Sequence, residues 1–95
     1  MHGSKTITVV LPAYNEERYI RPAVDDFFVP DIVDEVIVVD NNSRDRTAEE
    51  ARQTRARVVH ESQQGYGHAL QRGIREAKGD IVILAEPDGT FLGRD

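Results

Sequence analysis

The run Ile81-Val82-Ile83-Leu84 is the feature that most constrains how this chain can fold. Four consecutive apolar residues are too few for a core helix, and they are typical of a strand buried on both faces of a parallel sheet. Gly79 and Asp80 separate the run from the segment before it. Pro87 ends it, because proline cannot donate a hydrogen bond to a neighbouring strand. The sequence therefore predicts a buried parallel strand at 81–84.

Two carboxylates, Glu86 and Asp88, follow this strand and precede Gly89. Residues two apart in an extended chain point to the same side, so both carboxylates can face one crevice. Carboxylates this close repel each other, and a divalent cation with oxygen ligands removes the conflict. A polar turn that caps the strand is the alternative, and the spacing alone favours the two equally. The position favours the metal site, because open α/β sheets bind ligands beyond the carboxyl ends of their strands.

Strands and helices alternate along the rest of the chain, each recognised by its apolar pattern. We expect strands at 6–11, 35–40, 57–60 and 81–84; the first should end at Pro12, and the third should lie at an edge of the sheet. We expect a first helix from about Arg21 to Pro30 and a second over 47–54, with Ala48 and Ala51 facing inward. A third helix should follow 65–67 and end at a C′ glycine, Gly79. The first helix begins late because Pro22 inside a helix would cost about 3 kcal/mol. This order predicts an α/β fold: a parallel open sheet with helices on both faces and right-handed crossovers.

Composition narrows the range of functions. The net charge of −5 argues against a nucleic-acid-binding surface, which needs a basic stripe. No apolar run approaches the ~20 residues of a membrane helix, so no membrane segment is expected in this chain. The absence of cysteine excludes disulfides and thiol catalysis, and it suits a reducing cytosol. Residues 1–5 are expected to be a disordered start outside the fold.

Polar residues follow three of the predicted strands: 14–16, 40–42 and 86–88. Each group alone is better explained as a cap or a solvated turn. Together, at one rim of a parallel sheet, they predict a crevice that suits the ribose and base of a nucleoside, with the third group on a metal. Gly65-Tyr66-Gly67 adds backbone amides at a helix N-terminus, a suitable place for phosphate, although a flexible turn explains the glycines equally well.

The motifs carry a resemblance that covers nearly the whole chain in the correct order. Four segments resemble family-2 glycosyltransferases of the GT-A fold: 9–17 (Val-Val-Leu-Pro-Ala-Tyr-Asn-Glu-Glu), 36–43, 65–69 and 86–89. Gly73, Ala77 and Gly79-Asp80, between the last two segments, belong to the same resemblance. The branch that contains polyprenyl-phosphate sugar transferases is the most similar. The resemblance implies the strand order 3-2-1-4 and a Rossmann-like half of a GT-A domain.

The resemblance also implies site residues and a cofactor. The nucleoside would be held by Pro12, Ala13, Tyr14 and Glu16, the base by Asp40, and the rest of the nucleotide by Asn42, Gly67, Glu86 and Asp88. Asp88 would bind a Mg²⁺ or Mn²⁺ ion that bridges the diphosphate of a UDP- or GDP-linked sugar. Glu86 is the second metal residue, although it stands where the family usually has aspartate.

Family-2 enzymes have their catalytic base and acceptor site downstream of this turn. Residues 6–95 are therefore expected to form a truncated nucleotide-sugar-binding domain of an inverting enzyme, inactive alone, from a protein located in the cytoplasm or at the cytoplasmic face of the membrane. The strand at Asp80–Ala85 would then lack a neighbour on one side. An open apolar edge of this kind pairs readily with a copy of itself, which predicts a homodimer or poor solubility.

Two functions of other classes compete with this interpretation. A dinucleotide-dependent oxidoreductase needs Gly-x-Gly-x-x-Gly directly after the first strand, where this chain has Pro-Ala-Tyr-Asn-Glu-Glu. A receiver-like signalling module would use Asp40 as a phosphoacceptor. Acetyl-phosphate labelling would separate the second alternative from nucleotide binding.

Overall fold

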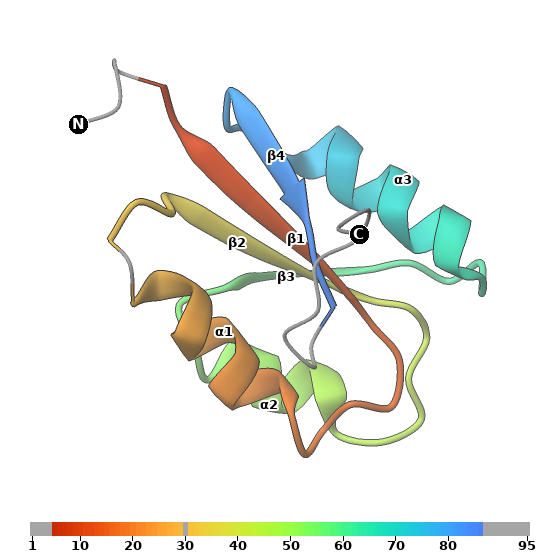
Figure 1. Cartoon of the computed structure of the whole chain (residues 1–95). Helices are drawn as coiled ribbons and strands as arrows, with labels where there is room; N and C mark the ends of the chain where they lie inside the picture. Colours follow the sequence, from red (N-terminus) through yellow and green to blue (C-terminus); the bar gives the residue numbers. More distant parts are fainter. Residues whose placement is uncertain (1–4, 30, 87–95) are drawn as a thin grey trace.

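The computed structural model describes residues 5–29 and 31–86. Within them four strands alternate with three helices: β1 (Ile7–Ala13), α1 (Ile20–Phe28), β2 (Glu35–Asp40), α2 (Thr47–Arg52), β3 (Arg57–His60), α3 (Tyr66–Glu76) and β4 (Ile81–Leu84). The strands form one parallel sheet in the order β3-β2-β1-β4 (Figure 1). The predicted α/β class and the strand order 3-2-1-4 are both confirmed.

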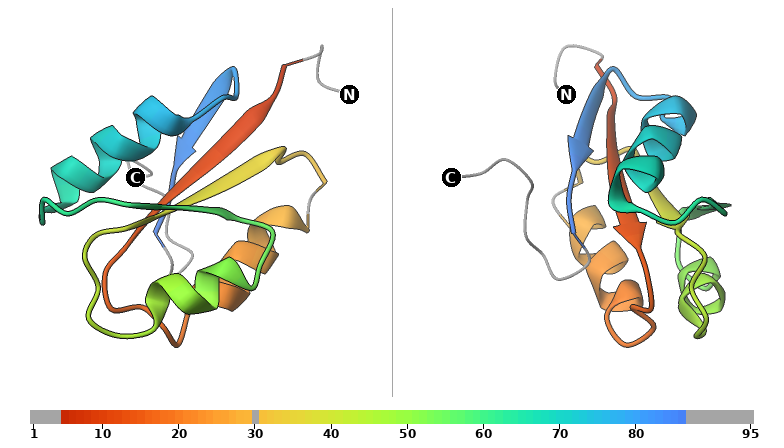
Figure 2. Two further views of the ribbon diagram at one scale, coloured as in Figure 1. Left: turned by 180° about the vertical axis from the view of Figure 1, so that it is seen from behind. Right: turned by 90° about the vertical axis from the view of Figure 1, so that its right-hand side faces the viewer.

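The helices cover both faces of the sheet, with α3 on one face and α1 and α2 on the other (Figure 2). Successive side chains of a strand point to opposite faces, so each central strand contributes to two apolar layers. Val9 and Leu11 of β1 pack toward α1 and α2, whereas Val10 packs toward α3. None of the helices in the described part is long and apolar enough to cross a membrane.

Pro12 does not end the first strand, contrary to the expectation. β1 continues through Pro12 to Ala13, and Pro12 stands opposite Val39 of β2. In a parallel strand alternate residues bond to opposite neighbours, and Val10 accepts a bond from Ala85 on the β4 side. Pro12 lies two residues further on, so its nitrogen also faces the β4 side, where β4 has already ended. The missing N–H therefore costs β1 no bond to β2.

The first helix begins at Ile20, one residue before the expected start, and Pro22 lies in its first turn. The N–H groups of a first turn have no partner inside the helix, so proline is tolerated there. The expected closing residue, Pro30, lies outside the described residues. At the other end of this helix the Arg55 guanidinium lies 4.0 Å from the centre of the Phe28 ring, which joins α1 to the chain before β3.

The second helix is shorter than expected, ending at Arg52 rather than at 54. The Thr54 hydroxyl donates to the Ala51 carbonyl and accepts from the Ala56 N–H, which turns the chain out of the helix. Its inward face also differs, because Thr47 and Ala51 are buried and Ala48 is only half-buried. Burial of Thr47 matters for the site, since its hydroxyl contacts the loop after β1.

Gly79 is not the C′ glycine of α3, which the sequence predicted. The helix ends at Glu76 with Ala77 as its extended C-cap, and the described glycine with positive φ is Gly65. Gly79 is required by packing: a Cβ at this position would lie 2.6 Å from the Thr8 hydroxyl oxygen and 2.8 Å from the Thr8 nitrogen. Only glycine allows the chain to pass this close to β1 before it enters β4.

The expectation that β4 is buried on both faces is wrong for its first half. Ile81 is 43% exposed and Val82 37% exposed. β4 stands at the end of the strand order and α3 covers β1 and β2, so within the described residues one edge and part of each face of β4 stay open. The same position agrees with the predicted open edge at Asp80–Ala85.

A polar group, which we call the amino-end cluster, fills the space under the C-terminal end of α3. It consists of Thr8, Glu35, Arg57, Glu76 and Gly79. The Thr8 hydroxyl is fully buried, donates to Glu35 at 2.8 Å and accepts the Gly79 N–H at 2.9 Å. Arg57 lies 3.4 Å from one Glu35 oxygen and 3.0 Å from Glu76. The cluster thereby connects β1, β2 and β3 to α3 and to the start of β4.

The charges of this cluster stabilise one another. Burial alone would raise the pKa of Glu35, but hydrogen bonds from the Thr8 hydroxyl and the Lys78 N–H, with the charge of Arg57, outweigh it and lower that pKa. Hydrogen bonds from Arg57 and Arg72 lower the pKa of Glu76. Both glutamates are therefore held in the ionised form that the cluster needs.

Candidate functional site

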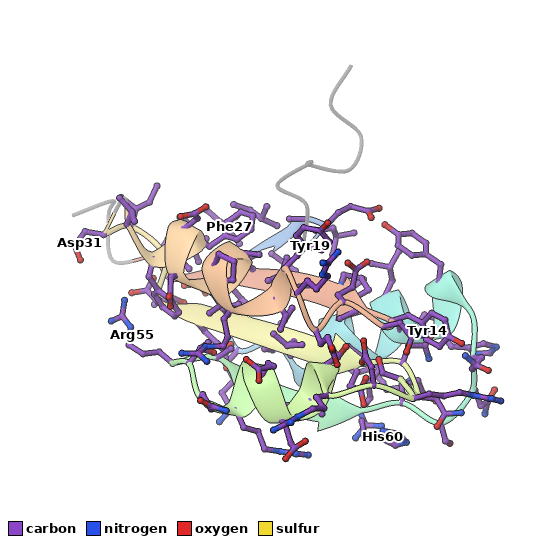
Figure 3. The ribbon with its side chains drawn as sticks, turned by 90° about the horizontal axis from the view of Figure 1, so that it is seen from below. Tyr14, Tyr19, Phe27, Asp31, Arg55 and His60 are labelled. Carbon is purple, nitrogen blue, oxygen red and sulfur yellow. The ribbon has the colours of Figure 1, made fainter. Side chains whose placement is uncertain are left out.

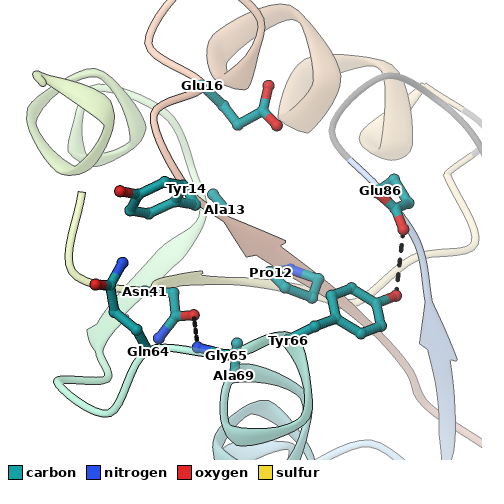
Figure 4. A pocket seen from close by; sticks show the side chains of 10 residues that line it. All are labelled: Pro12, Ala13, Tyr14, Glu16, Asn41, Gln64, Gly65, Tyr66, Ala69 and Glu86. Carbon is teal, nitrogen blue, oxygen red and sulfur yellow. Dashed lines mark hydrogen bonds between the residues drawn. The ribbon is translucent and has the colours of Figure 1, made fainter. Parts of the chain in front are cut away.

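A pocket of about 270 Å³ opens at the carboxyl ends of the strands, beside the first turn of α3 (Figure 4). Its lining comes from the end of β1 and the loop after it, the residue after β2, the start of α3 with the segment before it, and Glu86 after β4. The lining residues are Pro12, Ala13, Tyr14, Glu16, Asn41, Gln64, Gly65, Tyr66, Ala69 and Glu86. Figure 3 shows Tyr14 at the end of the molecule opposite Asp31 and Arg55. The pocket thus occupies the rim where ligands of open α/β sheets bind.

The loops after β1 and β2 are tied together by side-chain bonds. Asn15 has a φ of 52°, a left-handed conformation that asparagine tolerates. Its N–H donates to the Ser43 hydroxyl, and its side-chain oxygen accepts from the Arg44 N–H, each at 2.9 Å. The Glu16 N–H donates to the buried Thr47 hydroxyl at 2.8 Å. These bonds fix the backbone that carries Tyr14 and Glu16 into the pocket.

Asn41 holds the segment that leads into α3. Its side-chain NH₂ donates to the carbonyls of Glu61 and Gln63, at 3.1 and 2.9 Å, and its side-chain oxygen accepts the Gly65 N–H at 2.9 Å. The side chain is nearly buried, so these bonds are shielded from water. Gly65 has a φ of 133°, which side chains rarely adopt. Asn41 and Gly65 together determine where Tyr66 begins α3.

Tyr66 and Glu86 face each other across the pocket, and the Tyr66 hydroxyl donates to Glu86 Oε2 at 3.2 Å (Figure 4). Burial raises the pKa of the Tyr66 phenol, and the negative charge and hydrogen bond of Glu86 raise it further. The phenol therefore stays protonated at neutral pH and acts as a donor. This bond is the link between the first turn of α3 and the end of β4.

Among the described residues, those that line the pocket carry negative charge. Among its ten lining residues, Glu16 and Glu86 are carboxylates and no lysine, arginine or histidine is present. An anionic ligand such as a diphosphate would be repelled by such a surface unless a cation came with it. Mg²⁺ is usually bound by only one or two carboxylates together with substrate phosphates, so this donor set fits a cation that arrives with a nucleotide. The described residues hold no cluster of three or more acids, histidines or cysteines for a metal without substrate.

Five of the nine predicted site residues line the pocket: Pro12, Ala13, Tyr14, Glu16 and Glu86. Asp40, Asn42 and Gly67 are not among the lining residues, and Asp88 lies outside the described residues. The Asp40 side chain is buried, accepts the Ser43 N–H at 3.2 Å and lies 3.5 Å from His60 Nδ1. Asn42 is exposed, with a φ of 65°.

Of the remaining lining residues, Asn41 belongs to the polar group 40–42, and Gly65 and Tyr66 belong to the loop 65–67, both of which the sequence predicted at this rim; Gln64 and Ala69 were not predicted. The loop 65–67 was expected near a phosphate, but its first two members, rather than Gly67, line the pocket. Ala69 lies one helical turn after Tyr66, and that spacing could have placed both on one side. Gln64 carries no recognisable signal in the sequence.

Comparisons with known proteins follow the same motifs. The model of the family described as "Glycosyl transferase family 2" matches residues 8–94. Glucosyl-3-phosphoglycerate synthase of Mycobacterium tuberculosis (strain H37Rv) is 40% identical over 96 residues, which cover 90% of this chain and 30% of the relative. Protein RfbJ of Shigella flexneri is 32% identical over 91 residues, covering 96% of this chain and 70% of the relative.

Solved structures show the same similarity in three dimensions. A crystal structure of the M. tuberculosis synthase with Mn²⁺, UDP and phosphoglyceric acid has a TM-score of 0.79 and 38% identity, covering 90% of this chain and 34% of that one. Another contains Mn²⁺ and UDP-glucose, with the same TM-score and identity. The chain spans about a third of the length of these synthases. The similarity is not specifically to polyprenyl-phosphate sugar transferases, so it supports the family but not that branch.

Proposed function

Because the chain belongs to glycosyl transferase family 2, we propose that it forms the nucleotide-sugar-binding part of a glycosyltransferase. This part would bind a nucleoside-diphosphate sugar together with Mn²⁺ or Mg²⁺. UDP-glucose is the donor we propose, with a GDP-linked sugar as the competing possibility. The relatives with this fold whose structures contain UDP-glucose and Mn²⁺ support that choice.

The observation that carries the proposal is the charge of the pocket. In the part of the chain that the structure describes, two carboxylates and no cationic side chain line a cavity beside the first turn of α3. Backbone N–H groups at a helix N-terminus favour an anion, whereas Glu16 and Glu86 oppose one. A nucleotide that brings a divalent cation satisfies both, because the phosphates take the helix end and the cation takes a carboxylate. A neutral sugar alone would use neither feature.

The residue roles in the proposal follow the lining of the pocket. Pro12, Ala13 and Tyr14 line the pocket and are proposed to hold the nucleoside. Asp40, which pairs with Ala13 across the sheet, is proposed to bind the base. Asn42 and Gly67 are proposed to complete the nucleotide site. Glu86 and Asp88 would hold the metal, which when bound would act as a Lewis acid that offsets the charge on the leaving diphosphate.

Family membership decides against the two competing classes. A receiver module belongs to another family, whereas the family model that matches residues 8–94 is that of glycosyl transferases. The loop from Tyr14 to Tyr19 contains no glycine, whereas the dinucleotide fingerprint requires three.

The acceptor belongs to the activity of a longer protein. Similarity to glucosyl-3-phosphoglycerate synthases makes a phosphorylated small acid the acceptor we propose, in place of polyprenyl phosphate. Inversion at the anomeric carbon and a cytoplasmic location remain predictions. The anomeric configuration of the product, read by NMR, tests the first.

The proposal is tested by titrating UDP into the chain by calorimetry, once with Mn²⁺ and once with EDTA. Wild type should bind more tightly with Mn²⁺. Asp88→Asn should weaken binding about tenfold or more in Mn²⁺, as metal-shell substitutions commonly do, and change little in EDTA. Asp25→Asn on the exposed face of α1 is the control for losing one carboxylate. Equal wild-type affinity in Mn²⁺ and EDTA would contradict the metal-dependent site.

A further inference from the structure

We infer that Tyr66 is a positioning residue for Glu86, whose phenol hydroxyl competes with the divalent cation for the Glu86 carboxylate. The inference rests on the proposed function and adds to it a residue that sets how strongly metal and nucleotide binding are coupled. It starts from one contact: the Tyr66 hydroxyl donates to Glu86 Oε2 at 3.2 Å across the pocket (Figure 4).

The competition follows from the chemistry of the two partners. The hydroxyl points its positive proton at Glu86 Oε2, one of the two carboxylate oxygens that a cation can contact, and a phenol proton and a divalent cation on the same oxygen repel each other. The phenol remains protonated at neutral pH, since its ordinary pKa is already about 10. A cation that binds through Oε2 must therefore displace the Tyr66 hydroxyl, and the lost hydrogen bond is subtracted from the metal affinity.

The position of Tyr66 makes this exchange feasible. Its backbone is fixed at the first residue of α3 by the Gly65 N–H bond to Asn41, whereas its side chain is 47% exposed. Because the residue is only about half-buried, the ring can turn out of the pocket with the loss of little contact surface, and the helix stays where it is. Glu86 lies two residues after the end of β4 and is half-buried, so the bond also holds this carboxylate toward the pocket before the cation arrives.

The test compares how much Mn²⁺ improves UDP binding in wild type and in Tyr66→Phe. The measured quantity is the ratio of the UDP dissociation constant in EDTA to that in Mn²⁺. Any direct contact between the ring and UDP affects both constants and cancels in the ratio. Removing the hydroxyl should raise the ratio about three- to tenfold, the value of one hydrogen bond to a charged group at a partly exposed site. Tyr19→Phe, which removes an exposed hydroxyl outside the pocket, should leave the ratio unchanged.

A second comparison shows whether the effect passes through Glu86. In a Glu86→Gln background, Tyr66→Phe should no longer change the ratio. An unchanged or lower ratio in Tyr66→Phe, or a rise that persists without the Glu86 carboxylate, overturns the inference and leaves the proposed function intact. A wild-type ratio of one overturns the proposed metal site itself, and the inference with it. Circular dichroism confirms that each variant is folded before its ratio is used.

Discussion

The two ends of the parallel sheet are built for opposite purposes. At the amino end, the Thr8 hydroxyl, Glu35 and Arg57 are bonded to one another and to the chain after α3, and no space remains beside Gly79. At the carboxyl end, the described residues that line an open pocket include two carboxylates and two half-exposed tyrosines. Ion pairs with matched charges occupy the first end, and charges of one sign occupy the second.

The difference teaches where this fold can accept a ligand. In the described part of the chain no buried side-chain nitrogen or oxygen lacks a hydrogen-bond partner, so the amino-end cluster offers nothing to a ligand. The pocket has volume, a helix N-terminus and a charge imbalance that a bound cation would correct. We therefore propose that the same sheet uses one end for stability and the other for binding.

The largest effect is expected from introducing the same methyl group at each end. Gly79→Ala places a Cβ 2.6 Å from the Thr8 hydroxyl oxygen and 2.8 Å from the Thr8 nitrogen, and backbone cannot move aside cheaply. We expect a loss of about 2–3 kcal/mol in the free energy of unfolding, measured by urea denaturation. Gly67→Ala at the pocket end has nothing within 4 Å and should change it by less than about 1 kcal/mol, because alanine is well tolerated in a helix. Equal losses would show that the two ends are packed alike.

A smaller effect is expected from acid. The pKa of Glu35 is lowered in the folded chain from its ordinary value of 4.5, so its contribution to stability is complete above that pH and is lost as the pH falls through the folded-state pKa. Glu35→Gln should therefore lower the free energy of unfolding at neutral pH and make its decline in acid shallower. Urea denaturation between neutral pH and about pH 3 measures both. Asp25→Asn is the control, and an unchanged acid slope in Glu35→Gln would mean that the amino-end cluster does not depend on this charge.

The smallest effect concerns the edge strand β4, which within the described residues pairs only with residues 7–10 of β1. Ile81 and Val82 are exposed on an edge with no charged residue within the strand, so we expect the chain to self-associate through it. Val82→Lys should shift the association toward monomer, as measured by light scattering, with a slight loss of stability. Val29→Lys, on a more exposed valine away from β4, should not. A wild-type chain that is monomeric at high concentration would contradict this expectation.

Local patterns predicted most of the fold. The bounds of β2, β3 and β4 equal the predicted ranges, because each is a short β-branched run bounded by turn residues. The prediction failed where the role of a residue is determined by a contact with a residue distant in the sequence. Gly79 follows α3 in the sequence, but Thr8, 71 residues away, determines its role. Pro12 was expected to end a strand, and only the short reach of β4 makes it harmless.

The site was predictable to a similar degree and for the same reason. Pro12 through Glu16 and Glu86 were found because they follow strands, whose carboxyl ends meet at one rim. Asn41 follows a strand too, yet its function depends on carbonyls at 61 and 63 and on the Gly65 N–H, none of which is near it in sequence. The orientation of Tyr66 toward Glu86 likewise depends on the relative placement of α3 and β4, which no local pattern contains.

The position of β1 in the sheet also has a consequence for the order in which the chain can fold. β1 is the first strand in the sequence and lies between β2 and β4, and the Thr6 carbonyl accepts a bond from the Ile81 N–H. Closing that loop brings together segments more than 70 residues apart, a slow step because the entropy is lost before the contacts are gained. During synthesis, β1 can pair with β2 early but must keep its other edge exposed until β4 has left the ribosome. An early folding nucleus on β1, β2 and α1, completed late by α3 and β4, is the pathway that this topology favours.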